Sequence, residues 1–130
     1  MLTTGLKGRQ EITVNENNTA ASCGSGLLDV LSTPHMLALI EMTAWQSVQA
    51  ELEEGQGTVG TRLDVKHLAA SPVGMKVRCE TELVEIDRRH LVFEASVYDE
   101  CGLVGSGTHE RFIIDNEKFI AKANARNGLH

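Results

Sequence analysis

Residues 31–55 read LSTPHMLALIEMTAWQSVQAELEEG and carry the long helical pattern of this 130-residue chain. Thr33 followed by Pro34 is a start signal, because a threonine hydroxyl can cap free backbone amides and proline fits the first helical position. Apolar residues then recur at helical spacing, and a glycine marks the end of the pattern. We expect a helix from Pro34 to Glu53 or Glu54.

Glu41 interrupts this helix as the one charged residue between Pro34 and Ala50. At about 100° per residue it falls inside the apolar stripe. The stripe consists of Leu37, Ile40, Ala44, Val48 and Leu52. A carboxylate on such a face must be hydrogen-bonded, paired with a cation or protonated. A structural partner, such as a backbone amide or an arginine at the rim of a sheet, and a catalytic role both fit.

After the helix, the apolar period changes from 3.6 to 2, which is typical of strands. In residues 59–68 one face is expected to carry Val59, Thr61, Leu63, Val65 and His67, and the other Gly60, Arg62, Asp64, Lys66 and Leu68. Strand patterns also cover residues 10–14, 75–86, 91–97 and 103–114, with a slip at Val84 that indicates a bulge. One long helix with five strands predicts an α+β fold with an antiparallel sheet.

Composition indicates one domain spanning residues 1–130, with residues 116–130 as a polar tail or short helix. The net charge of −6 does not indicate nucleic-acid binding, and the sequence has no run of basic residues that would bind a membrane surface. No segment approaches the roughly 20 apolar residues of a membrane-spanning helix. We therefore expect a cytoplasmic protein. Three widely spaced cysteines and a THERF segment lacking the second histidine of H-E-x-x-H predict free thiols and no metal.

Like Glu41, His67 is an ionisable residue on an apolar face, because it ends a strand face that is expected to point towards the helix. A histidine at such a position can be a satisfied core residue, and Thr33 can be a helix cap and nothing more. Ionisable groups on facing apolar surfaces nevertheless favour acid and base chemistry. Thr33, Glu41 and His67 are therefore the candidate site.

Three segments, VLSTPHMLALIE, GTVGTRLDVKHLAASPVGMKV and LVFEASVYDECGLVGSGTHERFII, resemble the hotdog-fold thioesterase family that includes fluoroacetyl-CoA thioesterase. The resemblance covers about residues 10–115. It implies a long central helix wrapped by a curved antiparallel sheet of about five strands. It also implies a homodimer or tetramer whose subunits join sheets edge to edge, with acyl-CoA sites at the interface. No cofactor is implied, since coenzyme A is part of the substrate.

The resemblance places the family's catalytic residues on Thr33, Glu41 and His67, and its carbonyl-binding glycine on Gly60. Candidates for the coenzyme A phosphates are Arg62, Lys66, Lys76, Arg78, Arg88 and Arg89, although solvated strand edges explain such residues equally well. The family's phenylalanine lid has no counterpart in residues 22–32, SCGSGLLDVLS, which contain no aromatic residue. We therefore expect a small or medium acyl group and not a fluorinated one.

Two other functions use the same residues. A noncatalytic acyl-CoA-binding module would bind the ester without turnover, and an enoyl-CoA hydratase would place different chemistry on the same fold. The hydratase is less favoured, since the chain shows no hydratase-type loop with a paired carboxylate and histidine. Loss of turnover in His67→Ala would separate the enzyme from the binding module.

Overall fold

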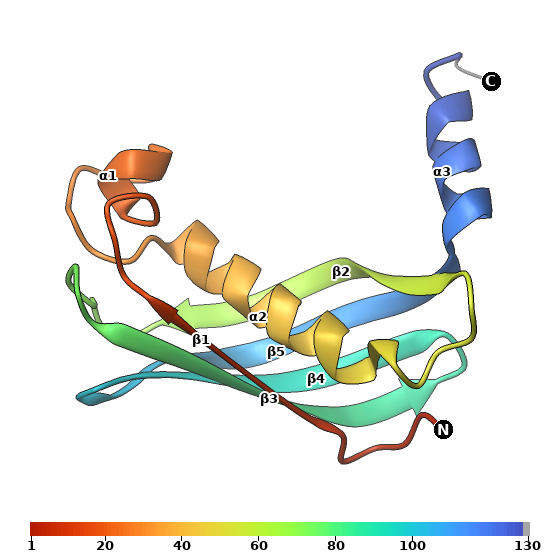
Figure 1. The fold of residues 1–130 in the computed structure, drawn as a ribbon, viewed down its shortest axis with the longest axis horizontal. Helices are drawn as coiled ribbons and strands as arrows, with labels where there is room; N and C mark the ends of the chain where they lie inside the picture. Colours follow the sequence, from red (N-terminus) through yellow and green to blue (C-terminus); the bar gives the residue numbers. More distant parts are fainter. Residues whose placement is uncertain (129–130) are drawn as a thin grey trace.

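The computed structural model describes residues 1–128, in which five strands form one antiparallel sheet of order β1-β3-β4-β5-β2 (Figure 1). The elements are β1 (Lys7–Thr13), α1 (Ala20–Cys23), α2 (Thr33–Gln49), β2 (Gln56–His67), β3 (Lys76–Asp87), β4 (His90–Asp99), β5 (Gly102–Asp115) and α3 (Asn116–Ala125). The predicted α+β architecture with one long helix and five strands is confirmed. Because β2 closes one end of the strand order, it is an edge strand.

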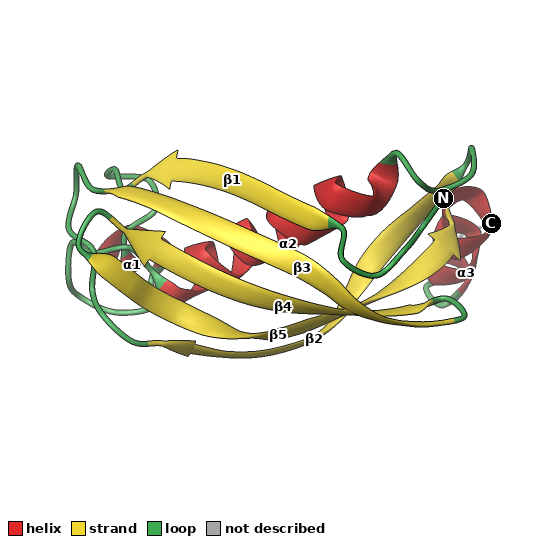
Figure 2. Cartoon of the chain, turned by 90° about the horizontal axis from the view of Figure 1, so that it is seen from below, coloured by secondary structure: helices red, strands yellow, loops and turns green. Residues whose placement is uncertain are grey.

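The sheet curves around α2, which lies along its concave face (Figures 1 and 2). Alternation in β3 and β4 turns every second side chain towards this helix, as the period of two predicts. The buried side chains of these two strands are Val77, Cys79, Thr81, Leu83, Leu91, Phe93, Ala95 and Val97. Together with Met36, Ile40 and Val48 of α2 they form the core.

The start of α2 differs from the expectation, because Ser32 and not Thr33 is the cap. The Oγ of Ser32 accepts a hydrogen bond from the backbone N–H of His35 at 3.0 Å. This satisfies one free amide of the first turn. The hydroxyl of Thr33, the first helical residue, is therefore available for another contact.

The end of α2 also differs, since the helix stops at Gln49 rather than at Glu53 or Glu54. Gly55 adopts a φ of 82°, so it reverses the chain inside the following loop and not at the helix end. The side-chain amide of Gln49 donates to the carbonyl of Gln56 at 2.9 Å and ties the helix end to the start of β2.

A bulge in β2 corrects the expected division of its faces. Gly60 pairs with Arg111 and Arg62 with Glu110, so Thr61 is an extra residue in the ladder. The extra residue turns Gly60 towards α2, on the same face as His67, whereas strict alternation placed Gly60 on the opposite face. The predicted bulge near Val84 is confirmed by the register shift between Leu83 and Glu85.

Two shorter elements complete the chain. α1 is capped by the hydroxyl of Thr19, which accepts a hydrogen bond from the N–H of Ser22 at 3.1 Å. α3 begins where β5 ends and points away from the sheet, as expected for a short terminal helix (Figure 1). The remainder of that prediction, Leu129 and His130, lies outside the described residues. Among residues 1–128, every helix is too short or too polar to cross a membrane.

Candidate active site

Thr33 and His67 form a hydrogen-bonded pair between the start of α2 and the end of β2. The distance from Oγ1 of Thr33 to Nδ1 of His67 is 2.8 Å. Since Ser32 provides the helix cap, this contact and not capping occupies the Thr33 hydroxyl. Nε2 of His67 has no hydrogen-bond partner within residues 1–128, although the atom is buried.

An open pocket of about 340 Å³ adjoins this pair. It is lined by Ala20, Ser25, Val30, Leu31, Thr33, His67, Leu68, Ala69 and Ala70. His67 is the one ionisable side chain in this lining, and most of the others are small or aliphatic. The pocket can therefore hold a small uncharged group next to a histidine.

Glu41 lies farther along α2, in contact with β2 and β5. Its Oε2 is 3.3 Å from Nη1 of Arg111, whose side chain is 6% exposed, whereas the Glu41 side chain is 40% exposed. A Cβ at position 60 would overlap Oε2 of Glu41, so only glycine lets the carboxylate lie over the strand. Gly60 therefore permits the close approach of the Glu41 side chain, next to the bulge at Thr61.

Arg111 is the residue that the sequence reasoning missed. Burial lowers the pKa of its guanidinium, and the neighbouring Glu41 carboxylate opposes that shift. Nε of Arg111 donates to Oγ1 of Thr58 at 2.8 Å, and Nη2 donates to the Thr58 carbonyl at 2.9 Å. A signal was present in the THERF segment, since His109 and Arg111 alternate with exposed residues and share the inward face of Ile113.

The four predicted residues are brought together in two pairs rather than in one group. Thr33 contacts His67, and Glu41 lies over Gly60. Eight residues of helix separate Thr33 from Glu41, or about 12 Å. Seven residues of strand separate Gly60 from His67, or about 23 Å.

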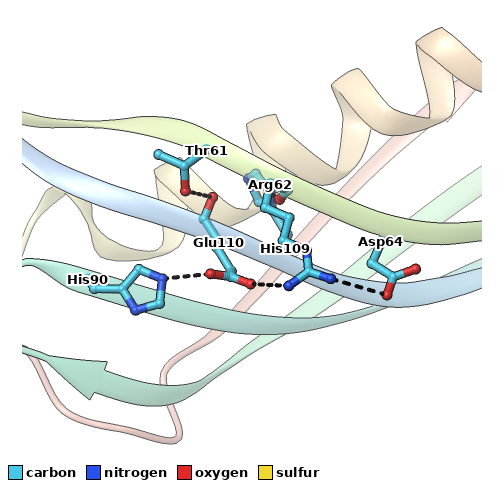
Figure 3. A network of polar contacts seen from close by, with 6 residues as sticks. All are labelled: Thr61, Arg62, Asp64, His90, His109 and Glu110. Atoms are coloured by element: carbon cyan, nitrogen blue, oxygen red, sulfur yellow. Dashed lines mark hydrogen bonds and ion pairs between the residues drawn. The ribbon is translucent and has the colours of Figure 1, made fainter.

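Arg62, a candidate for coenzyme A phosphates, lies on the outer face of the sheet and is engaged there. Its guanidinium contacts Glu110 at 3.5 Å and Asp64 at 3.9 Å, and Glu110 also contacts His90 at 2.7 Å (Figure 3). A phosphate at Arg62 would have to compete with these two carboxylates.

Three of the other five phosphate candidates, Lys66, Lys76 and Arg78, do not gather with Arg62. Lys66 is exposed on β2, whereas Lys76 and Arg78 lie on β3, and β5 and β4 separate the two strands. Arg78 also contacts Glu80 at 2.7 Å and stacks over the ring of Tyr98. A phosphate site made from all four side chains within one subunit does not follow from this arrangement.

Cys23 lies near the first pair, because its thiol contacts the hydroxyl of Ser25 in the pocket lining at 3.4 Å. Burial raises the pKa of the Cys79 thiol to about 11, which keeps it protonated in the core, and Cys23 and Cys101 are exposed free thiols. Over residues 1–128, no three side chains of histidine, cysteine, aspartate or glutamate are grouped as metal ligands.

The chain is similar in sequence to known thioesterases. Residues 14–117 match the model of the family described as fluoroacetyl-CoA-specific thioesterase. Fluoroacetyl-CoA thioesterase of Streptantibioticus cattleyicolor is 38% identical over 98 residues, which cover 75% of this chain and 70% of that protein.

Solved structures match the fold. A variant of the fluoroacetyl-CoA-specific thioesterase in complex with fluoroacetate and CoA superimposes with a TM-score of 0.86 at 31% identity, covering 91% of this chain and 99% of that one. A hot-dog-like protein from Thermanaerovibrio acidaminovorans has a TM-score of 0.86 at 23% identity, with 95% and 91% covered, and supports the fold alone. The chain has the hotdog fold and belongs to the family of fluoroacetyl-CoA-specific thioesterases.

Proposed function

We propose that this thioesterase hydrolyses a small or medium aliphatic acyl-CoA to the free acid and coenzyme A, using Thr33, His67, Glu41 and Gly60. The observation that carries the proposal is the Thr33–His67 hydrogen bond in the lining of a small open pocket, whose other side chains are mostly small or aliphatic. The volume of about 340 Å³ lies at the lower end of ligand pockets, and a charged acyl group would find no partner in its lining except His67.

The chemistry assigns a role to each pair. His67 acts as the general base that takes a proton from water, and the water attacks the thioester carbonyl carbon. The carbonyl oxygen becomes an oxyanion that the N–H of Gly60 stabilises. Collapse of the intermediate expels the coenzyme A thiolate, which receives the proton held by His67 and so restores the base. Thr33 orients His67. Glu41 positions the attacking water or serves transiently as the acyl acceptor.

We propose further that the enzyme is a homodimer whose sites each combine the two pairs. Gly60 and His67 lie on the same face of the edge strand β2, on either side of Leu63 and Asp64. Antiparallel pairing of two β2 edges about these central residues brings Gly60 of one subunit next to the partner's His67. The separation of the two pairs within one subunit supports this arrangement, and so does Nε2 of His67, which has no hydrogen-bond partner among residues 1–128.

Subunit complementation tests the shared site directly. His67→Ala and Glu41→Gln are each expected to lower turnover by at least about 10²-fold. If the pairs combine across the interface, a refolded mixture of the two variants contains sites in which both residues are intact, and about a quarter of the parent activity returns. Sites contained within one subunit would give no recovery, and a monomer in sedimentation would rule out the shared site.

The acyl group is tested by the initial rate of loss of thioester ultraviolet absorbance with acetyl-, fluoroacetyl-, branched short-chain, medium-chain and phenylacetyl-CoA. We expect hydrolysis of an aliphatic ester that His67→Ala abolishes. The relative that this chain resembles is described as acting on fluoroacetyl-CoA. Because residues 22–32 contain no aromatic side chain, we do not expect a fluorinated ester to be preferred here. Saturable CoA-ester binding without turnover would favour the binding module instead.

A further inference from the structure

His109 is fully buried on β5, and its two ring nitrogens make different contacts. Nδ1 lies 2.8 Å from the carbonyl oxygen of Arg62, and Nε2 lies 3.1 Å from Nη1 of Arg111. A carbonyl only accepts and a guanidinium only donates. The ring is therefore neutral, with its proton on Nδ1 and an accepting lone pair on Nε2.

The guanidinium of Arg111 is held on three sides. Thr58 accepts from Nε and from Nη2, and His109 accepts one of the two N–H bonds of Nη1. The remaining N–H of Nη1 points to Oε2 of Glu41 at 3.3 Å. Because a guanidinium is planar and rigid, three fixed contacts also fix the direction of the fourth.

Glu41 needs such a support because its side chain is 40% exposed and has no other hydrogen bond among the described residues. A carboxylate with this freedom would sample several rotamers in water. We infer that neutral His109 is a positioning residue, which holds Arg111 so that Arg111 fixes the Glu41 carboxylate over Gly60. This inference rests on the catalytic role proposed for Glu41.

The alternative is that the contacts among His109, Arg111 and Thr58 only stabilise the sheet. Their loss would then lower turnover only by unfolding the protein. The two hypotheses make different predictions for a substitution that keeps a hydrogen-bond acceptor at position 109. A glutamine there can donate its amide N–H to the Arg62 carbonyl and accept from Arg111 with its oxygen, whereas a leucine of similar volume can do neither. Positioning therefore predicts that glutamine restores turnover and leucine does not.

The first experiment compares kcat and KM for His109→Gln and His109→Leu. Misplacement of a reacting group lowers the rate of the chemical step, so we expect His109→Leu to lower kcat about 10-fold or more without a matching rise in KM. His109→Gln should stay within about 3-fold of the parent. His90→Leu is the matched control, since His90 contacts Glu110 on the outer face and lies outside the site. Equal losses of kcat in the two variants of His109 would overturn the inference.

A double-mutant cycle with Glu41→Gln completes the test. If His109 acts through Glu41, His109→Leu causes little further loss in the Glu41→Gln background, because the group that it positions is already disabled. If the 10-fold loss persists there, the inference is wrong, although the role of Glu41 stands. If Glu41→Gln alone leaves kcat unchanged, the proposed role of Glu41 fails first. Should His109→Leu not fold, Thr58→Val removes another acceptor of Arg111 and enters the same cycle.

Discussion

The two pairs of the candidate site differ in how many contacts hold them. Thr33 and His67 share one hydrogen bond at the edge of an open pocket, where Thr33 is exposed. Glu41 instead rests on a buried guanidinium, which is bonded to Thr58 and His109 as well. The first pair can adjust to a substrate, whereas the Glu41 carboxylate of the second is fixed by Arg111, which is bonded within the sheet. Changes at the first should therefore affect turnover, and changes at the second should also affect folding.

Arg111→Met should lower the free energy of unfolding more than any other change to the candidate site. It removes the cation and leaves polar groups of His109 and Thr58 without a donor. Each buried group left unpaired costs about 1–3 kcal/mol, so we expect the free energy of unfolding to fall by about 2–4 kcal/mol. Urea denaturation, monitored by circular dichroism, measures this free energy of unfolding. A loss below about 0.5 kcal/mol would mean that the contacts of Arg111 hold Glu41 no better than the single hydrogen bond holds Thr33 and His67.

Thr33→Val should lower turnover and leave stability almost unchanged, unlike Arg111→Met. It removes the hydroxyl that contacts His67 but leaves the Ser32 cap intact, so we expect kcat to fall about 10- to 100-fold and stability to change by less than about 0.5 kcal/mol. Ser32→Ala is the matched change, since losing the cap costs about 1 kcal/mol of stability. Steady-state rates and thermal unfolding of both variants give the answer, and a Thr33→Val variant with full activity would remove Thr33 from the site.

Gly60→Ala should affect both properties at once. The added Cβ overlaps the Glu41 carboxylate and must displace it, so we expect a loss of about 1 kcal/mol and roughly a 10-fold lower kcat. Gly26→Ala is the control, because its Cβ would meet only Ala20 at an ordinary distance of 3.4 Å. Initial rates and urea midpoints of the two variants test this. Normal turnover in Gly60→Ala would contradict the need for close approach.

Stability should depend on pH through His109. Burial lowers the pKa of His109 below its usual 6.5, and the charge of Arg111 acts in the same direction. Below pH 6.5 the unfolded chain therefore binds a proton that the folded chain does not. The free energy of unfolding should fall by up to about 1.4 kcal/mol for each further unit of acidification, until the folded histidine also titrates.

His109→Gln tests the origin of that slope, since glutamine does not titrate and keeps the contact with Arg111. Urea denaturation between pH 5 and pH 7 should be less pH-dependent in this variant than in the parent. The Arg111 and Glu41 charges near the ring are the same in both proteins. An unchanged slope would assign the acid sensitivity to other carboxylates or histidines.

Much of the architecture was predictable, because it depends on periods that local sequence displays. Of the predicted helical stripe, Ile40, Ala44 and Val48 lie in the core, whereas Leu37 and Leu52 are only partly buried. Met36, Leu39 and Thr43 are buried although they lie outside that stripe. The helix cap was misassigned because Ser32 and Thr33 are both good caps, and the choice depends on backbone geometry at one residue. The faces of β2 were misassigned in part because a bulge changes parity without leaving a strong local signal.

The α+β class, the resemblance to the thioesterase family and the candidates Thr33, Glu41, His67 and Gly60 could all be predicted from the sequence. They depend on helical and strand periods and on the charge at position 41, which are properties of neighbouring residues. Which of the four residues meet depends on the fold, since those contacts join α2 to strands far away in the chain. The bulge at Thr61 turned Gly60 towards Glu41, and the fold brought Arg111 and His109 beneath it.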